Sequence, residues 1–358
     1  MHDLVDFKGA IHVHSRYSDG SDGMETIIAA ARAAGLDYVL VSDHNVLKAK
    51  TLGWEGWHDG VLVIIGCEIS PPRSGHVLAL SIHDCDGMKK MSPPEYLRRV
   101  REQGGIAFVA HPSGNEIRDF NLNLASWKDW DNPDYHGMEI WSYMHDWIEG
   151  CHIRNMLEYI RNPQDHITGP QPDVLQLWDQ LAQSRRIVGL GALDNHAANL
   201  PFRKLPWKIL KVFPHEQVFR TVRTHVLIPP PSRTNHGDVD SFIDALARGR
   251  CFIDYALLGD GTGFQFTASQ DGLDYQMGDS LPAGRPVGFR VQCPQPAEII
   301  LLRDGAAELA ADGTALDHST DGRPGAYRVE ARINHKPWLF SNHICVRAGE
   351  EEGKKKRR

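Results

Sequence analysis

The sequence predicts an α/β domain followed by a smaller all-β sandwich. Over about the first 250 residues, short apolar strand patterns alternate with helical patterns. After about residue 256, short alternating runs separated by DG, AG and DGRPG turns replace them, without a long helical pattern. The first pattern favours parallel strands with crossover helices, in a barrel or an open sheet. The second is typical of an antiparallel sandwich of about seven strands.

The elements of the first part follow from local signals. The expected strands occupy residues 7–14, 38–42, 61–68, 75–82, 106–110, 137–141, 187–192 and 251–254. The expected helices occupy residues 23–34, 93–103, 174–184 and 239–248, with Pro93 near one start and Gly35 and Gly104 just beyond two ends. Residues 116–172 fit neither pattern, and we expect loops and short helices there. The domains expected are therefore 1–255, 256–350 and a charged tail, 351–358.

Composition narrows the class of protein. The chain has 358 residues, of which 41% are hydrophobic and 24% charged, as in ordinary globular proteins. The longest apolar run, 61–65, is too short to span a membrane, and no secretory signal is visible. Six scattered cysteines without a CxxC pair indicate reduced thiols and a cytoplasmic location. A net charge of −7 argues against binding of duplex nucleic acid. We expect a small-molecule substrate. The sequence leaves open whether the protein forms a homodimer.

Metal-binding residue types lie at or beside the end of nearly every expected strand. His12 and His14 are two residues apart in the first strand, so their side chains share one face. In a parallel α/β domain these strand ends converge on one site. The other residues of this pattern are Asp19, His44, Glu68, His76, His111, Asp194 and His196.

These residue types indicate a site for several cations. Histidine suits Zn, Mn and Fe, and carboxylates can bridge two ions. No cysteine belongs to the pattern, which disfavours a closed structural zinc site. Such a cluster can lower the pKa of bound water and stabilise the charge of a displacement reaction. The sequence has no P-loop and no GxSxG nucleophile elbow.

The motifs HVHSRYSDG, VSDHN, GCEIS to GHVLAL, AHP and LDNH resemble those of the PHP (polymerase and histidinol phosphatase) superfamily over about residues 8–255. The resemblance implies a distorted (β/α)7 barrel with two or three divalent ions (Zn, Mn or Fe). It implies one metal on His12, His14, Glu68 and Asp194. It implies a second on Glu68, His76 and His111, and a third on Asp19, His44 and His196. If His76 is not a ligand, the site would be binuclear. His83 lies close to His76 in the sequence, which leaves the match of His76 to the motif open.

The C-terminal part is similar to that of one branch of this superfamily. GRCFID after a helix, followed by a β-rich part ending in KPWLFSNHICVR, resembles the carbaryl-hydrolase-like (CehA/McbA) branch. The branch implies ester or carbamate hydrolysis, whereas the wider superfamily mostly cleaves phosphoesters.

Several other residues are candidates for roles around the site. Arg73, Ser113 and Arg118 lie in loops expected to cap it and could bind phosphoryl oxygens. Glu139 could contact substrate or orient a ligand, and Asp43 is expected to orient one. His145 could protonate a leaving group. Trp127, Trp130, Tyr135, Trp141, Tyr143 and Trp147 could line a pocket, but ordinary packing is favoured.

The sequence thus predicts a hydrolase in which metal-bound hydroxide attacks a small phosphoester, a phosphomonoester or nucleotide. The expected catalytic groups are Glu68, Asp194, His196 and His145. The chemical alternative is a carboxyl-ester or carbamate hydrolase with the same metals. The alternative of another class is a non-catalytic, metal-bearing binding module, whose signature would be missing ligands; here every expected position is filled.

Overall fold

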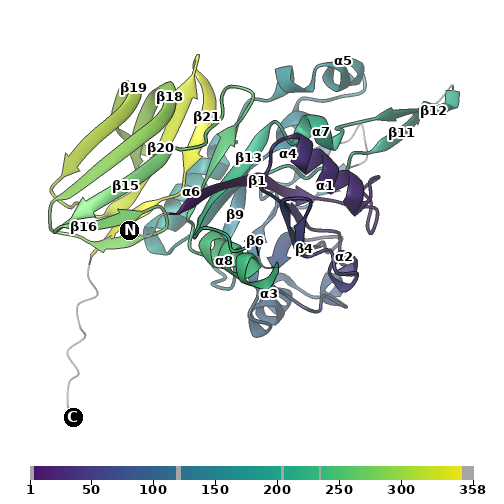
Figure 1. Cartoon of the computed structure of the whole chain (residues 1–358), viewed down its shortest axis with the longest axis horizontal. Helices are drawn as coiled ribbons and strands as arrows, with labels where there is room; N and C mark the ends of the chain where they lie inside the picture. The colour runs from purple at the N-terminus through teal and green to yellow at the C-terminus, as the bar shows by residue number, and fades with distance from the viewer. Residues whose placement is uncertain (1–3, 118–121, 203–204, 234, 349–358) are drawn as a thin grey trace, which may run out of the picture.

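The computed structural model describes residues 4–117, 122–202, 205–233 and 235–348, and up to residue 255 strands and helices alternate (Figure 1). The strands of this part are β1 (Val5–Val13), β2 (Tyr38–Val41), β3 (Gly56–His58), β4 (Val61–Ile69), β5 (Val77–Leu80), β6 (Ile106–Val109), β7 (Asn115–Ile117), β8 (Leu122–Leu124), β9 (Gly137–Ser142), β10 (Val188–Ala192), β11 (Asn199–Phe202), β12 (Leu205–Lys211), β13 (Val222–Ile228) and β14 (Cys251–Tyr255).

The α-helices are α1 (Met24–Ala33), α2 (Lys48–Thr51), α3 (Pro93–Glu102), α4 (Tyr143–Glu149), α5 (Met156–Arg161), α6 (Pro172–Ser184), α7 (His215–Val218) and α8 (Asn235–Ala247), with 3-10 turns η1 (Met88–Lys90) and η3 (Pro163–His166). Helix α3 illustrates how the sequence sets its bounds. Ser92 and Glu95 form a capping box at its start, and the backbone at Gly104 just beyond its end has a φ of 74°.

The main sheet of this part mixes parallel and antiparallel pairs. β1 with β2, β2 with β4, β6 with β9 and β9 with β10 are parallel, as predicted. The prediction is wrong for β5, which is antiparallel to both β4 and β6. Only residues 70–76 join β4 to β5, too few for a crossover helix. The strand β13 was not predicted from the sequence, and it is antiparallel to both β1 and β14.

The carboxyl ends of β1 and β10 come together at the edge that carries the predicted ligands. The backbone N–H of Leu193 donates to the carbonyl of Ile11, and that of Asn195 to the carbonyl of His12 (2.9 and 3.1 Å). The N–H of His14 donates in turn to the carbonyl of Asn195 (2.9 Å). These bonds fix the first and the last predicted ligand segments against each other.

The C-terminal region is rich in β-structure and has a core of its own, including Phe266, Val291, Tyr327 and Trp338. Its strands are β15 (Gln265–Gln270), β16 (Leu273–Gln276), β17 (Ser280–Pro282), β18 (Val287–Arg303), β19 (Ala306–Thr320), β20 (Gly325–Ile333), β21 (Lys336–Ser341) and β22 (Ile344–Arg347). The long β18 pairs with β15, β19 and β20. The expectation of purely antiparallel pairing is wrong at one place, because β17 and β22 are parallel.

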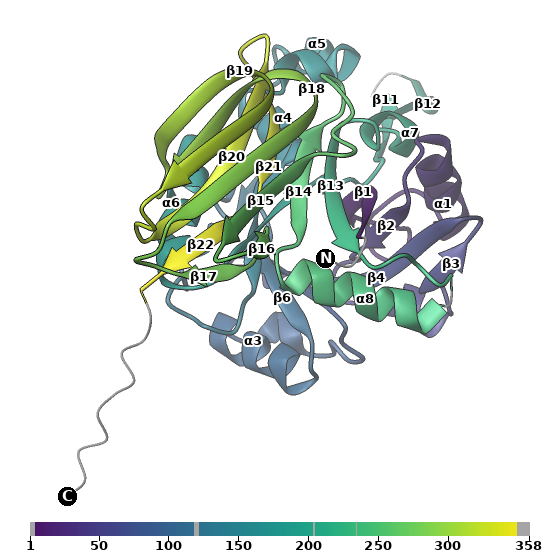
Figure 2. The ribbon, with the colours of Figure 1, turned by 60° about the vertical axis from the view of Figure 1, so that its left-hand side comes forward.

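The two parts share a strand and a buried ionic network. β14 pairs with β13 on one side and with β21 on the other, so the expected boundary at residue 255 falls at the end of a shared strand (Figure 2). On α6, Asp179 accepts two hydrogen bonds from Arg328 of β20 (2.6 and 2.8 Å) and one from His343 (2.9 Å). All three side chains are buried. The C-terminal region is therefore joined to the α/β domain by backbone pairing between strands and by buried ion pairs.

Three further expectations concern the whole chain. All six cysteines are buried and free. Within the described part of the chain, no helix combines the length and the apolar character needed to cross a membrane. The expected charged tail, 351–358, lies outside the described residues.

Replacing Asp179 by Ala should lower the free energy of unfolding by about 3 kcal/mol, because the buried Arg328 loses two of its hydrogen bonds to carboxylates and keeps only the one to Glu330. Urea unfolding measures this change. The matched control is Asp317→Ala, which removes an exposed ion pair with Arg290 and should cost less than about 1 kcal/mol. Equal effects of the two substitutions would contradict the docking role of Asp179.

A second prediction concerns pH. Burial acts to lower the pKa of His225, but Asp254 and Asp6 outweigh it and raise the pKa to about 9. Because the folded pKa lies above the unfolded value of about 6.5, the stabilisation is complete below pH 6.5 and is lost as pH rises through 9. Wild type should therefore lose on the order of 3 kcal/mol more than His225→Gln between pH 6.5 and 9.5. Parallel pH profiles in urea unfolding would refute this.

Candidate metal centre

The nine predicted ligands meet at one edge of the main sheet. His12 and His14 lie at the end of β1, Asp19 in the next loop, and the others at or beside the ends of β2, β4, β5, β6 and β10. β5 is reversed, but His76 precedes it, so His76 still lies at this edge. Donor atoms of these residues and of His145 fall within 4.8 Å of one another in four overlapping groups: His12, His14, Glu68 and Asp194; Glu68, His76 and His111; His14, Asp19, His44 and His196; and His111, His145 and Asp194.

The first group has the dimensions of a tetrahedral site. The Nε2 atom of His12 lies 3.3 Å from both Glu68 Oε2 and Asp194 Oδ1. The Nε2 atom of His14 lies 3.4 and 3.1 Å from the same two oxygens. A tetrahedron with metal–ligand bonds of about 2.0–2.1 Å has edges of about 3.3 Å. All four side chains are buried, so the group fits a zinc-sized cation.

Several donor atoms in the cluster lack hydrogen-bond partners among the described residues. They are His12 Nε2, His14 Nδ1, Glu68 Oε2 and His111 Nδ1, all buried. Buried polar atoms without partners are rare, because losing water without a replacement costs free energy. Cations between the groups would satisfy atoms that the protein itself leaves open.

The charges of the cluster also favour bound cations. Burial acts to lower the pKa of His12, but Glu139, Asp194 and Glu68 raise it well above its ordinary value. Burial acts to raise the pKa of Glu68, but the neighbouring histidines, His12 first, hold it well below its usual range. The buried carboxylates thus draw a proton onto His12, and a divalent cation would supply the same positive charge.

Glu68 joins the first group to the second. Its Oε1 atom lies 2.7 Å from His76 Nδ1 and 3.1 Å from His111 Nε2, while Oε2 faces His12 and His14. One carboxylate therefore presents its two oxygens to two sets of histidines. His83, the sequence neighbour of His76, is exposed and belongs to none of the groups.

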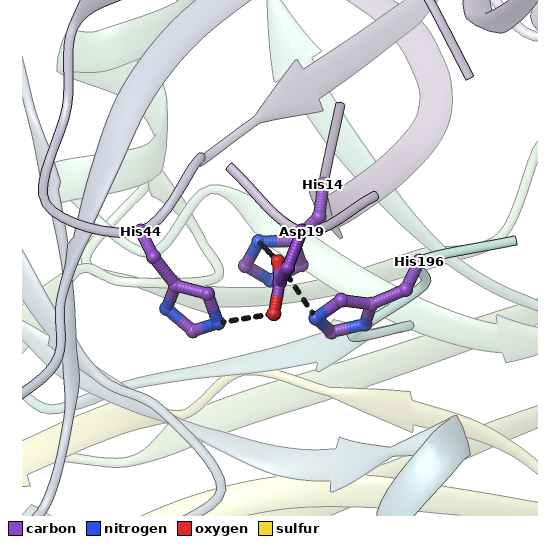
Figure 3. A group of neighbouring side chains, drawn as sticks. All are labelled: His14, Asp19, His44 and His196. Carbon is purple, nitrogen blue, oxygen red and sulfur yellow. Dashed lines mark ion pairs between the residues drawn. The ribbon is translucent and has the colours of Figure 1, made fainter. Parts of the chain in front are cut away.

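The third group is the open side of the centre. Figure 3 shows the Asp19 carboxylate between the rings of His44 and His196, with His14 behind it. Asp19 oxygens lie 3.5 Å from His44 Nε2 and 3.3 Å from His196 Nε2. The Asp19 side chain is 56% exposed, whereas those of His12 and His14 are fully buried. Solvent therefore reaches the cluster from this side.

Two predicted orienting groups hold ligands or loops in place. The Nδ1–H of His12 donates to Glu139 Oε1 (2.6 Å), which leaves Nε2 free for a cation. The other Glu139 oxygen accepts from the backbone N–H of His111 (2.8 Å). Glu139 is buried with both oxygens engaged, which favours the alternative that it orients a ligand. Asp43 accepts hydrogen bonds from Ser15 and Ser18 and so fixes the loop before Asp19.

The backbone is strained at three of the predicted ligands. His12, His111 and Asp194 have φ values of 66°, 29° and 50°, in a region that residues other than glycine seldom adopt. At His12 the pairing of β1 with β2 shifts register, so the simple alternation behind the HxH prediction does not hold. The two rings still meet, with centroids 5.0 Å apart. Such strain is typical of functional sites.

His145 joins the cluster from α4. Its Nε2 atom lies 3.2 Å from Asp194 Oδ2, and its ring stacks on His111 at 4.3 Å. Burial first, and then His111, lower the pKa of His145. The next residue, Asp146, was not among the predicted site residues. Asp146 accepts hydrogen bonds from Trp141, Thr168 and Gly169, and so anchors α4 to the segment before α6.

The remaining candidates differ in position. Ser113 lines a cavity of about 30 Å³ with His111, Glu139 and His145. Arg73 is exposed, and Arg118 lies outside the described residues. In the described part of the chain, the ion pairs of Asp19, Glu68, Glu139 and Asp194 are all with histidines. Of the predicted aromatic cluster, Trp127, Tyr135, Trp141, Tyr143 and Trp147 are buried in the core, which supports ordinary packing.

The sequence is similar to a known domain family and to a protein of another organism. The model of the PHP domain matches residues 10–111, which include every expected ligand except Asp194 and His196. An uncharacterized protein of Methanocaldococcus jannaschii, MJ1587, is 31% identical over 138 residues, covering 32% of this chain and 78% of that protein.

Two solved structures are similar at low identity. One is a two-domain protein of Bacteroides vulgatus, described as containing a predicted PHP-like metal-dependent phosphoesterase, with 14% identity, 96% of each chain covered and a TM-score of 0.45. The other is PsfC of Pseudomonas syringae, with 15% identity, 68% of this chain and 90% of that chain covered and a TM-score of 0.39.

The match to the PHP domain spans the segment that carries seven of the nine predicted ligands, and the relative MJ1587 is matched over most of its length. The chain therefore belongs to the PHP-domain family.

Proposed function

We propose that this protein is a metal-dependent phosphoesterase that hydrolyses a small phosphoester, either a phosphomonoester or a nucleotide. The observation that carries the proposal is the position of Glu68, whose two oxygens face two separate sets of histidines. Bound divalent cations would supply Lewis acidity, which acidifies water and neutralises charge on the phosphoryl oxygens. Zn, Mn and Fe all suit these donors.

The proposed ligand sets follow the groups found in the structure. His12, His14, Glu68 and Asp194 would hold one cation, and Glu68, His76 and His111 a second. Asp19, His44 and His196 would hold a third at the open side.

The chain's own groups have distinct tasks in this proposal. Glu139 keeps the proton of His12 on Nδ1 and so directs Nε2 into the cluster. His145 holds Oδ2 of Asp194, while Oδ1 faces His12 and His14. The buried first group excludes bulk water, and the half-exposed Asp19 admits the substrate. The closed, distorted (β/α)7 barrel expected from the resemblance is part of this proposal.

One observation favours the second candidate, a carboxyl-ester or carbamate hydrolase of the carbaryl-hydrolase-like branch. A phosphoryl dianion is normally bound by cationic side chains. In the described residues, however, the cluster carboxylates pair only with histidines, and Arg73 is exposed. The β-rich C-terminal region also suits that branch. A non-catalytic binding module is disfavoured, because none of the expected ligand residues is missing from the sequence.

A matched assay separates the two chemistries. Protein reconstituted with Mn or Zn should release p-nitrophenol from p-nitrophenyl phosphate, and a chelator should abolish this release because the cluster then lacks its cations. The same protein is tested on p-nitrophenyl acetate. Chelator-sensitive release from the acetate alone would overturn the phosphoesterase proposal in favour of the ester hydrolase.

Replacing Asp194 by Asn should lower turnover by about 100-fold or more, because the amide cannot supply a negative charge to the first and fourth groups. Metal content, measured by mass spectrometry, should fall, while the far-ultraviolet circular dichroism should stay unchanged. The control is Asp317→Asn on exposed β19. Full activity of Asp194→Asn would show that the site is wrongly assigned.

A further inference from the structure

A second crevice, of about 360 Å³, lies where the α/β domain meets the C-terminal region. Trp141 and Tyr255 line it, together with residues 164–165 and 167–169 before α6 and residues 335–337 at the turn between β20 and β21. Its volume is in the range of small-molecule pockets, about 300–1,000 Å³. None of the nine predicted metal ligands lines it, so this junction crevice is separate from the metal centre. Figure 2 shows β14 and β21, which lead into it, side by side.

The buried part of the junction crevice is aromatic and contains one open polar group. The rings of Trp141 and Tyr255 are 5.4 Å apart. Tyr255 is only 6% exposed, and its buried hydroxyl has no hydrogen-bond partner among the described residues. Leu257, beside it, is 48% exposed. An apolar body would cover Leu257 and the ring edges that line the crevice, and an ammonium group on the same ligand would donate to the hydroxyl oxygen.

The outer part of the junction crevice carries opposite charges on different elements. Lys336 comes from the C-terminal region, and Asp165 from the segment before α6. Both residues are exposed. Within the described ranges, neither forms an ion pair with the other or with a third residue. The two charges are therefore available to a ligand that lies between them.

We propose that the junction crevice binds a small zwitterion with an apolar side chain, of the α-amino acid class. Its carboxylate faces Lys336, its ammonium group faces Asp165, and its side chain lies against Trp141 and Tyr255. Paired charge-assisted contacts over an aromatic wall are what such a ligand requires. A phosphate dianion fits less well, because Asp165 repels it.

Three probes that differ only in charge test the proposal by isothermal titration calorimetry on the metal-loaded protein. They are L-phenylalanine, 3-phenylpropanoate, which lacks the ammonium group, and phenethylamine, which lacks the carboxylate. L-phenylalanine should bind about tenfold more tightly than either analogue, since each analogue loses one charged contact.

Two substitutions should remove this advantage selectively. Lys336→Met should bring the affinity for L-phenylalanine down to that for phenethylamine, and Asp165→Asn should bring it down to that for 3-phenylpropanoate. Lys89→Met, an exposed lysine on η1, is the control and should change nothing.

Absence of binding at millimolar L-phenylalanine would overturn the proposal. So would binding that neither substitution weakens, which would indicate chelation at the metal centre. No turnover is measured, so this result is independent of the phosphoesterase proposal.

Discussion

The position of one buried carboxylate, that of Glu68, constrains the rest of the centre. It is fully buried on β4, and its oxygens lie within 2.7–3.4 Å of donor atoms from β1, β2, the start of β5 and the end of β6. A charge in such a place is tolerated only when paired and hydrogen-bonded. The strands around Glu68 therefore have to deliver histidines to the same edge, and the folded sheet and the binding site impose the same geometry.

That geometry explains why the backbone departs from regular strand structure at this edge. A straight strand would present His12 and His14 by simple alternation, but β1 shifts register near His12, and three of the predicted ligands adopt positive φ. Local strain of this kind persists only where surrounding contacts hold it. Here the contacts are those of Glu139 with His12 and His111, and the backbone bonds between the ends of β1 and β10.

The sequence predicted which side chains meet at one edge better than it predicted the sheet that carries them. Histidines and carboxylates at successive strand ends form a pattern along the sequence. The pattern can be recognised without knowing the strand directions, because a residue at either end of a strand can lie at the same edge of the sheet. The reversed β5 illustrates this: its direction was predicted wrongly, yet His76 lies beside Glu68. The pairing of β13 with β1, the engaged oxygens of Glu139 and the role of Asp146 depend on tertiary contacts, which local patterns do not encode.

The C-terminal region belongs to the same physical unit as the centre. Pro337 of β21 packs so closely on Gly169 that a Cβ atom there would lie 2.8 Å from the proline ring. Phe340 of the same strand lies edge-on to Trp141, with ring centroids 5.9 Å apart. Trp141 and Gly169 both donate hydrogen bonds to Asp146, whose neighbour His145 contacts Asp194. Contact alone does not establish energetic coupling. It does place β21 against Trp141 and Gly169, two of the residues whose N–H groups hold Asp146 beside His145.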